Sequence, residues 1–126
     1  MAFPSPEFVS ALVAHLNENT AFHAASRWSD VKVVLAFGEQ RYWFKLYGGR
    51  VIDSMPYAPM ANPLGWDYSI SAPLETWCAL RAGERALGHL LDSGAIAVDG
   101  NLLEANRLYE STHLMLSAVR DLPAGN

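Results

Sequence analysis

The sequence has a single cysteine, Cys78, and therefore cannot form a disulfide framework. Basic residues are also few: nine Lys and Arg stand against 13 Asp and Glu, which gives a formal net charge of −4. Because nucleic-acid binding needs a concentrated basic surface for the phosphates, we expect no nucleic-acid partner. A chain of 126 residues can bury a core without disulfide or metal staples, so we expect residues 1–126 to form a single domain.

Long apolar runs are absent as well. A helix that spans a bilayer needs about 20 consecutive apolar residues, and no run in this sequence approaches that length. The first residues also lack the basic segment and the apolar segment of a secretory signal peptide. We therefore expect a cytoplasmic protein without a transmembrane segment.

Signatures of catalysis and of metal or cofactor binding are missing too. The sequence contains no G-x-S-x-G nucleophile elbow, no Walker loop and no G-x-G-x-x-G fingerprint. Cys78 has no His or carboxylate directly beside it to activate it, and we interpret it as a buried structural thiol. The histidines form no H-x-x-x-H pair, and the Glu110–His113 spacing lacks the second copy that a di-iron bundle needs. We expect no catalytic residue, no metal and no cofactor.

Apolar residues at helical spacing open the sequence. Residues 5–7 (SPE) combine a capping hydroxyl, a proline of preset φ and a carboxylate that favours a helix N-terminus. A second short helix begins at Asn19 or Thr20. The inward-facing residues expected on these two helices are Phe8, Leu12 and Leu16 on the first and Phe22, Ala25 and Trp28 on the second. The N-terminal region is therefore predicted to be a helical hairpin.

From residue 31 the apolar period changes from helical spacing to alternation, which predicts strands over residues 31–37 and 41–47. The second face of residues 31–37 is also weakly polar, so this strand is expected to be covered on both sides. Gly48 and Gly49 supply the positive φ angles of a tight hairpin turn into a third strand over 50–54. Residues 55–65 carry three prolines and are expected to form an apolar loop.

The second half of the chain is predicted to contain two further strands and three helices. Alternation over residues 66–71 predicts a fourth strand, and Ser71 can cap a helix that ends at Gly83. A short helix over 84–93, a fifth strand around Ile96 and Val98, and a long helix from Asn101 towards Asp121 follow. Because the strands are grouped, the sequence predicts an α+β fold with a five-stranded, largely antiparallel sheet covered by helices.

Several segments resemble the sterol carrier protein family. They are residues 46–51 (LYGGRV), 66–71 (WDYSIS), 80–84 (LRAGE) and, most specifically, 91–101 (LDSGAIAVDGN). The resemblance extends from about Phe8 to Leu122. It implies an apolar tunnel between the sheet and the helices, and binding or transfer of sterols, terpenoids, fatty acids or fatty acyl-CoA esters without chemistry. The 55–65 loop departs from the family pattern.

An excess of large apolar residues over the needs of a minimal core favours such a cavity. We expect it to lie under the helices, because a sheet face buries its alternating residues only there, with the 55–65 loop near its mouth. The expected lining residues are Phe44, Met55, Met60, Tyr68, Trp77, Leu87, Leu91 and Met115. In this location Trp77→Ala would weaken ligand binding more than it weakens the fold.

Three alternatives stay open at this stage. The large apolar residues could serve the core alone, or they could form an exposed patch for a homodimer or for docking on a partner enzyme. The chain could also be a small enzyme in which Asp67, Tyr109 or His113 transfers protons. Arg81, Arg85 and Arg27 are the cations available to a ligand's carboxylate or phosphate.

Overall fold

The computed structural model describes residues 2–58 and 65–124. The elements in chain order are α1 (Pro6–Glu18), α2 (Thr20–Ser26), β1 (Asp30–Phe37), β2 (Gln40–Tyr47), β3 (Arg50–Pro56), β4 (Tyr68–Ala72), α3 (Leu74–Arg81), α4 (Leu87–Asp92), β5 (Ala97–Gly100), α5 (Leu102–Arg107) and α6 (Tyr109–Asp121). The predicted α+β class and the predicted grouping of strands are confirmed.

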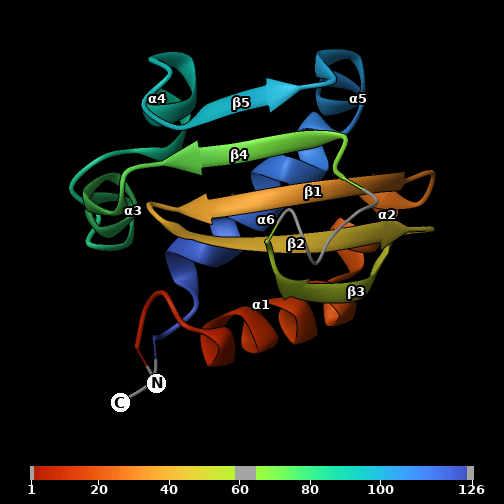
Figure 1. Ribbon diagram of the computed structural model, residues 1–126, viewed down its shortest axis with the longest axis horizontal. Coiled ribbons are helices and arrows are strands. Elements are labelled where there is room, and N and C mark those ends of the chain that lie inside the picture. Colours follow the sequence, from red (N-terminus) through yellow and green to blue (C-terminus); the bar gives the residue numbers. More distant parts are fainter. Residues whose placement is uncertain (1, 59–64, 125–126) are drawn as a thin grey trace.

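The five strands form one sheet in the order β3-β2-β1-β4-β5 (Figure 1). The pairs β1–β2, β2–β3 and β4–β5 are antiparallel, and β1–β4 is parallel. The expectation of a largely antiparallel sheet is therefore correct. The parallel pair arises because the chain leaves the β3 edge and returns on the other side of β1, which leaves β5 as the far edge strand.

The β2–β3 hairpin depends on two glycines. Gly48 and Gly49 have φ angles of 60° and 91°, as the sequence predicts for this turn. A Cβ atom on Gly49 would lie 2.7 Å from Nδ1 of His23 and 2.8 Å from its carbonyl oxygen. Glycine is therefore required at position 49 both by the backbone angle and by the close approach of α2.

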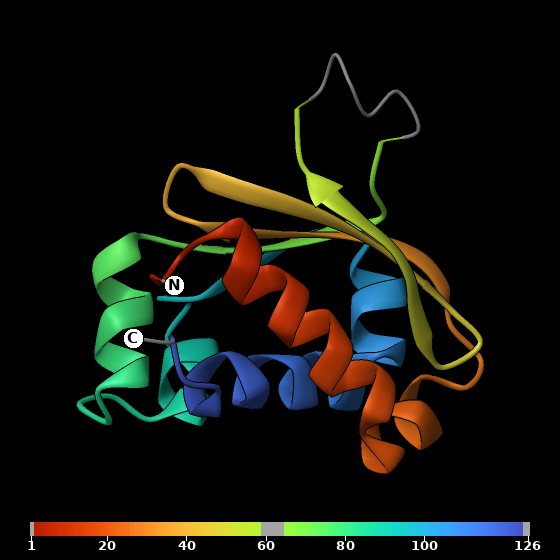
Figure 2. The same cartoon turned by 90° about the horizontal axis from the view of Figure 1, so that it is seen from below.

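The helices gather beneath one face of the sheet, and the main core lies between the two layers (Figure 2). Strand register brings core-facing residues together: Val33 of β1 pairs with Phe44 of β2 and with Tyr68 of β4. From the helices, Leu12, Leu16, Trp77, Leu90, Met115 and Val119 complete the packing. The residues that helical spacing predicts to face inward on α1, such as Leu12 and Leu16, are therefore buried in the core.

The opposite face of β1 and β2 is covered as well. Val34, Ala36 and Trp43 point away from the main core, yet all three are buried. The indole Nε1 of Trp43 donates a hydrogen bond of 2.8 Å to the carbonyl oxygen of Gly65, at the end of the 55–65 loop. The weak polarity of this face in the sequence thus has a structural cause.

Helix starts follow the expected capping chemistry in three places. The Ser5 hydroxyl accepts from the backbone N–H of Phe8, the Asn19 side chain from that of Phe22, and the Asn101 side chain from that of Glu104. The start of α3 differs from the prediction, because β4 continues through Ala72 and Pro73 takes the N-cap position without a side-chain hydrogen bond.

Three further expectations are wrong. Trp28 is 76% exposed instead of inward-facing, because it follows the end of α2 and lies under the Arg27 guanidinium. Cys78 is exposed, since its neighbour Trp77 occupies the inward face of α3. The closing helix is interrupted at Leu108, whose φ of −106° and ψ of 26° separate α5 from α6.

Strand β3 also continues two residues into the predicted loop, as far as Pro56. Proline is tolerated there because β3 is an edge strand. Within the described residues, no helix is long and apolar enough to cross a membrane.

Candidate ligand-binding site

A pocket of about 210 Å³ lies beside the β5 edge of the sheet. It is enclosed by the end of α4, by β5, by α5 and by the first turn of α6. Its lining residues are Leu91, Asp92, Val98, Leu102, Ala105, Asn106, Tyr109 and Thr112. We refer to it as the β5-edge pocket.

Burial divides this lining into a mouth and a floor. Asp92, Leu102, Asn106 and Tyr109 are exposed and mark the mouth. Ala105 and Thr112 are buried and form the floor. The pocket is therefore apolar over most of its walls, with polar groups at its opening and Thr112 as the polar residue at depth.

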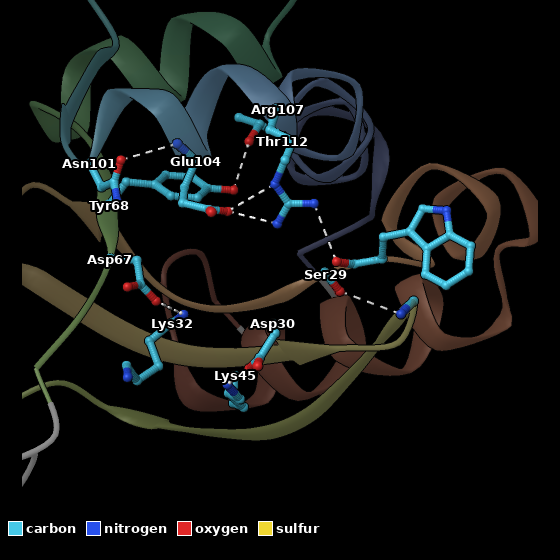
Figure 3. A network of polar contacts seen from close by, with 12 residues as sticks. Ser29, Asp30, Lys32, Lys45, Asp67, Tyr68, Asn101, Glu104, Arg107 and Thr112 are labelled. Atoms are coloured by element: carbon cyan, nitrogen blue, oxygen red, sulfur yellow. Dashed lines mark hydrogen bonds and ion pairs between the residues drawn. The ribbon is translucent and has the colours of Figure 1, made fainter.

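The floor ends on a pair of buried hydroxyl groups. The Tyr68 hydroxyl and Oγ1 of Thr112 lie 3.3 Å apart, and either one can donate (Figure 3). Burial raises the pKa of Tyr68 above its ordinary value of about 10, while the hydrogen bond with Thr112 acts in the opposite direction. Tyr68 therefore stays protonated at neutral pH and remains able to donate.

Helix α5 forms one wall and is held at both ends. At its start the Asn101 side chain accepts from the backbone N–H of Glu104 (Figure 3). Near its end the Arg107 guanidinium donates to the Glu104 carboxylate at 2.7 Å and to the carbonyl oxygen of Trp28 at 3.3 Å. These contacts connect a helix of only six residues to the loop that precedes β1.

Of the residues expected to line a cavity, Leu91 lines the β5-edge pocket. Tyr68 lies directly behind the pocket floor through its contact with Thr112. Phe44, Trp77, Leu87 and Met115 are packed in the main core. These four of the eight expected residues are therefore part of the packed core. Leu91 is the described member of the set that lines the β5-edge pocket.

Of the two methionines expected near the mouth, the structure places only Met55. Met55, in β3, lines a separate pocket of about 100 Å³ beside Val9 and Tyr42. Met60 lies outside the described residues. The described flanks of the 55–65 loop contact β2 instead, where the Arg41 guanidinium stacks on the Tyr57 ring and Trp43 bonds Gly65.

A larger hollow of about 560 Å³ lies along α3, and its lining residues are Leu74, Glu75, Cys78, Ala79, Ala82 and Glu84. Five of these six residues are exposed, so the hollow is an open groove that excludes little water. Because an apolar ligand gains affinity by leaving water, the smaller β5-edge pocket is the better candidate site.

The residues of the enzyme alternative are dispersed. Tyr109 lines the β5-edge pocket, and its ring lies 6.3 Å from that of His113. The Asp67 carboxylate instead accepts a hydrogen bond from the backbone N–H of Lys32, between β1 and β4. In the described ranges, no group of three or more His, Cys, Asp or Glu residues is placed to hold a metal ion.

The cations considered for ligand binding are engaged elsewhere or lie apart. The Arg81 guanidinium stacks over Phe3 and Phe8 and donates to the carbonyl oxygen of Val119. Arg27 stacks over Trp28. Neither these two nor Arg85 lines the β5-edge pocket.

Solved structures of sterol carrier proteins are similar to this arrangement. A crystal structure of sterol carrier protein 2 superposes with a TM-score of 0.76 at 16% identity, covering 94% of this chain and 98% of that chain. A protein from Thermus thermophilus, described as a possible sterol carrier protein, gives 0.72 at 16% identity over 96% and 90%. The chain has a sterol carrier protein 2 fold.

A third structure with this fold carries the description of a ubiquinone synthesis protein, UbiJ-SCP2. It superposes with a TM-score of 0.57 at 18% identity and covers 98% of this chain and 99% of that chain. No protein-family model matches the sequence, and no curated protein matches it either. The sterol carrier protein 2 fold, which the resemblance in sequence implied, thus rests on the similarity of the structures.

The pocket residues that sequence reasoning missed are Asp92, Val98, Leu102, Ala105, Asn106 and Thr112. The sequence analysis placed Val98 in the fifth strand, but nothing in the sequence distinguished a strand residue at an opening from one in the closed core. Leu102 carried the only usable signal of an apolar surface at this position. It follows the Asn101 cap directly, in the first turn of α5, and its side chain is exposed in the structure.

Proposed function

We propose that this protein is a non-catalytic carrier that binds one apolar small molecule in the β5-edge pocket and transfers it. The observation that supports this most is a mostly apolar pocket with a buried floor, at the edge of a sterol carrier protein 2 fold. Burial of about 300 Å² of apolar ligand surface is worth about 7 kcal/mol before the entropy cost of binding. Apolar burial can therefore supply most of the driving force for binding without a charged anchor.

Ligand entry widens the pocket. Its volume of about 210 Å³ is smaller than that of most small-molecule sites, which enclose about 300 Å³ or more. Two of its walls, α4 and α5, are helices of six residues each. Short helices at a sheet edge can shift outwards with less loss of packing than core elements, which makes them the moving walls.

Blocking the pocket tests this proposal. Val98→Trp would fill the pocket from the edge strand β5, where an aromatic residue is tolerated, while Ile52→Trp adds the same side chain to the exposed surface of the opposite edge strand β3. Titration calorimetry with 1-decanol and with decanoate measures affinity for a neutral and a charged probe. We expect Val98→Trp to weaken binding of whichever probe binds by about tenfold or more, with no change in Ile52→Trp.

Two outcomes reject the carrier proposal. The first is that neither probe binds the wild-type chain at saturating concentration and native mass spectrometry of the purified protein shows no bound apolar molecule. The second is that both substitutions leave the affinity for the probe unchanged. Equal weakening by the two substitutions would place the binding site elsewhere.

A second candidate function is docking on another protein, and the surface around α5 favours it. Leu103 and Trp28 are 79% and 76% exposed, and the carbonyl oxygen of Trp28 accepts from Arg107 of α5. Exposed apolar side chains beside a pocket suit a contact that opens and closes during transfer. UbiJ-SCP2, described as a ubiquinone synthesis protein, makes a biosynthetic enzyme a reasonable partner, and a second copy of this chain is the simplest one.

Sedimentation velocity tests whether a second copy of this chain binds this surface. If this surface forms a homodimer, the wild-type chain sediments as a dimer at high concentration and Leu103→Asp sediments as a monomer. A monomer for both chains excludes the homodimer.

A further inference from the structure

We infer that the β5-edge pocket selects an uncharged apolar molecule, whose single oxygen is hydrogen-bonded at the pocket floor, and that it rejects a carboxylate of the same chain length. This inference rests on the proposed function and narrows its ligand class. It is carried by the charges and hydrogen-bonding groups of the pocket lining.

The lining offers no positive charge. Its eight residues include no Lys, Arg or His, and the one charged residue is Asp92 at the mouth. Arg107 follows the lining residue Asn106 along α5, but its guanidinium is bound to the Glu104 carboxylate and to the carbonyl oxygen of Trp28. An anionic ligand would therefore meet a carboxylate without a compensating cation.

The floor offers a hydrogen bond to a neutral oxygen. Tyr68 and Thr112 together carry two hydroxyl protons, and their mutual contact at 3.3 Å uses one of them. When Tyr68 donates to Thr112, the Thr112 proton is available to an oxygen inside the pocket. A hydroxyl or ether oxygen at the end of an apolar chain can accept it without bringing a charge.

A carboxylate is disfavoured in either orientation. With its head at the floor, it would be buried among apolar walls with hydroxyl partners but no cation, and its desolvation would be uncompensated. With its head at the mouth, it would lie beside Asp92. An alcohol avoids both costs, because it can bond Thr112 at the floor or Asp92 and Asn106 at the mouth.

Titration calorimetry with 1-decanol and decanoate at pH 7.5 tests the inference on the wild-type chain and on Asp92→Asn. We expect the alcohol to bind about tenfold more tightly than the acid. Asp92→Asn should tighten decanoate binding about threefold or more and leave 1-decanol within twofold. Asp99→Asn is the matched control, since it removes the same charge from an exposed position on β5 outside the lining and should change neither affinity.

A second pair of variants tests the floor. Thr112→Val keeps the side-chain shape and removes the hydroxyl, so it should weaken 1-decanol binding about fivefold. Thr76→Val, on α3, makes the same change away from the pocket and should have no effect. Far-UV circular dichroism and a urea titration confirm that each variant is folded.

The outcomes separate this inference from the proposed function. Decanoate that binds as tightly as 1-decanol, or an acid affinity that Asp92→Asn does not raise, overturns the charge selection and leaves the carrier function standing. A 1-decanol affinity unchanged in Thr112→Val overturns the floor hydrogen bond. Failure of both probes to bind, together with the absence of any apolar molecule from native mass spectra of the purified protein, rejects the carrier function itself.

Discussion

Trp77 shows at the scale of one residue how a side chain expected to line a cavity can belong to the core. Its side chain is fully buried, its indole Nε1 donates to the carbonyl oxygen of Ala36 at 2.9 Å, and its ring packs edge-on against Phe37 with centroids 5.0 Å apart. A residue with these contacts is part of the close-packed layer. These contacts favour a larger effect of Trp77→Ala on stability than on binding, the opposite of what the sequence predicts.

We expect Trp77→Ala to lower the free energy of unfolding by about 3 to 5 kcal/mol, because it removes a large core side chain and leaves a cavity. Urea denaturation followed by circular dichroism measures the loss. Trp77→Phe is the companion variant: it retains an aromatic ring and loses the hydrogen bond to Ala36, and should cost clearly less. A loss below about 1 kcal/mol in Trp77→Ala, together with weaker ligand binding, would return Trp77 to the pocket.

Tyr68 gives the fold a dependence on alkaline pH. Burial raises its pKa in the folded state above the ordinary value of about 10, so above that pH the unfolded phenol releases its proton while the folded one retains it. The stability contributed by the neutral phenol is complete below about pH 10 and is lost as the pH rises through the folded-state pKa.

Urea titrations at about pH 9 and about pH 11 should therefore show a larger loss of stability for the wild-type chain than for Tyr68→Phe. The pKa of Tyr42 is also raised, chiefly by burial and also by Glu7, but Tyr42 is present in both chains and cancels in the comparison. Equal losses in the two chains would show that Tyr68 does not carry this pH dependence.

At the scale of elements, helix α5 links local sequence to the pocket. Its N-cap Asn101 accepts from the backbone N–H of Glu104, and replacing such a cap by alanine typically costs about 1 kcal/mol. Because α5 is a short wall at the edge of the sheet, we expect Asn101→Ala to increase hydrogen exchange in residues 102–107 while exchange in β1 and β2 stays unchanged.

Asn19→Ala is the matched control, since Asn19 caps α2 in the same way. It should increase exchange in α2 and leave α5 unaffected. Uniform acceleration throughout the sheet in Asn101→Ala would mean that α5 opens only with the whole domain, and would remove it as a moving wall.

The elements themselves were largely predictable from the sequence, and the pocket was not. Three features with local physical causes were predicted and are present in the structure: the strand at residues 31–37, the Gly48–Gly49 turn and the Asn101 cap. The pocket depends on where α4, β5, α5 and α6 meet in space. The break at Leu108 between α5 and α6, which the helical spacing does not reveal, helps to create that meeting point.

At the scale of the whole molecule, the fold separates a packed interior from an adaptable edge. The helices lie under one face of the sheet, and the strands at its centre are buried on both faces (Figure 2). The β5 edge instead carries two short helices, a pocket and exposed leucines. Uptake of a ligand at this edge would leave the central packing intact, which is a useful property in a carrier.

A crystal structure of the protein grown with 1-decanol would show whether the ligand occupies the β5-edge pocket. We expect the alkyl chain to lie between Leu91, Val98 and Ala105, with its oxygen within hydrogen-bond distance of Thr112 and with α5 shifted outwards. Alkyl density in the groove along α3, in the Met55 pocket or between the sheet and α1, with the β5-edge pocket closed and unchanged, would contradict this expectation.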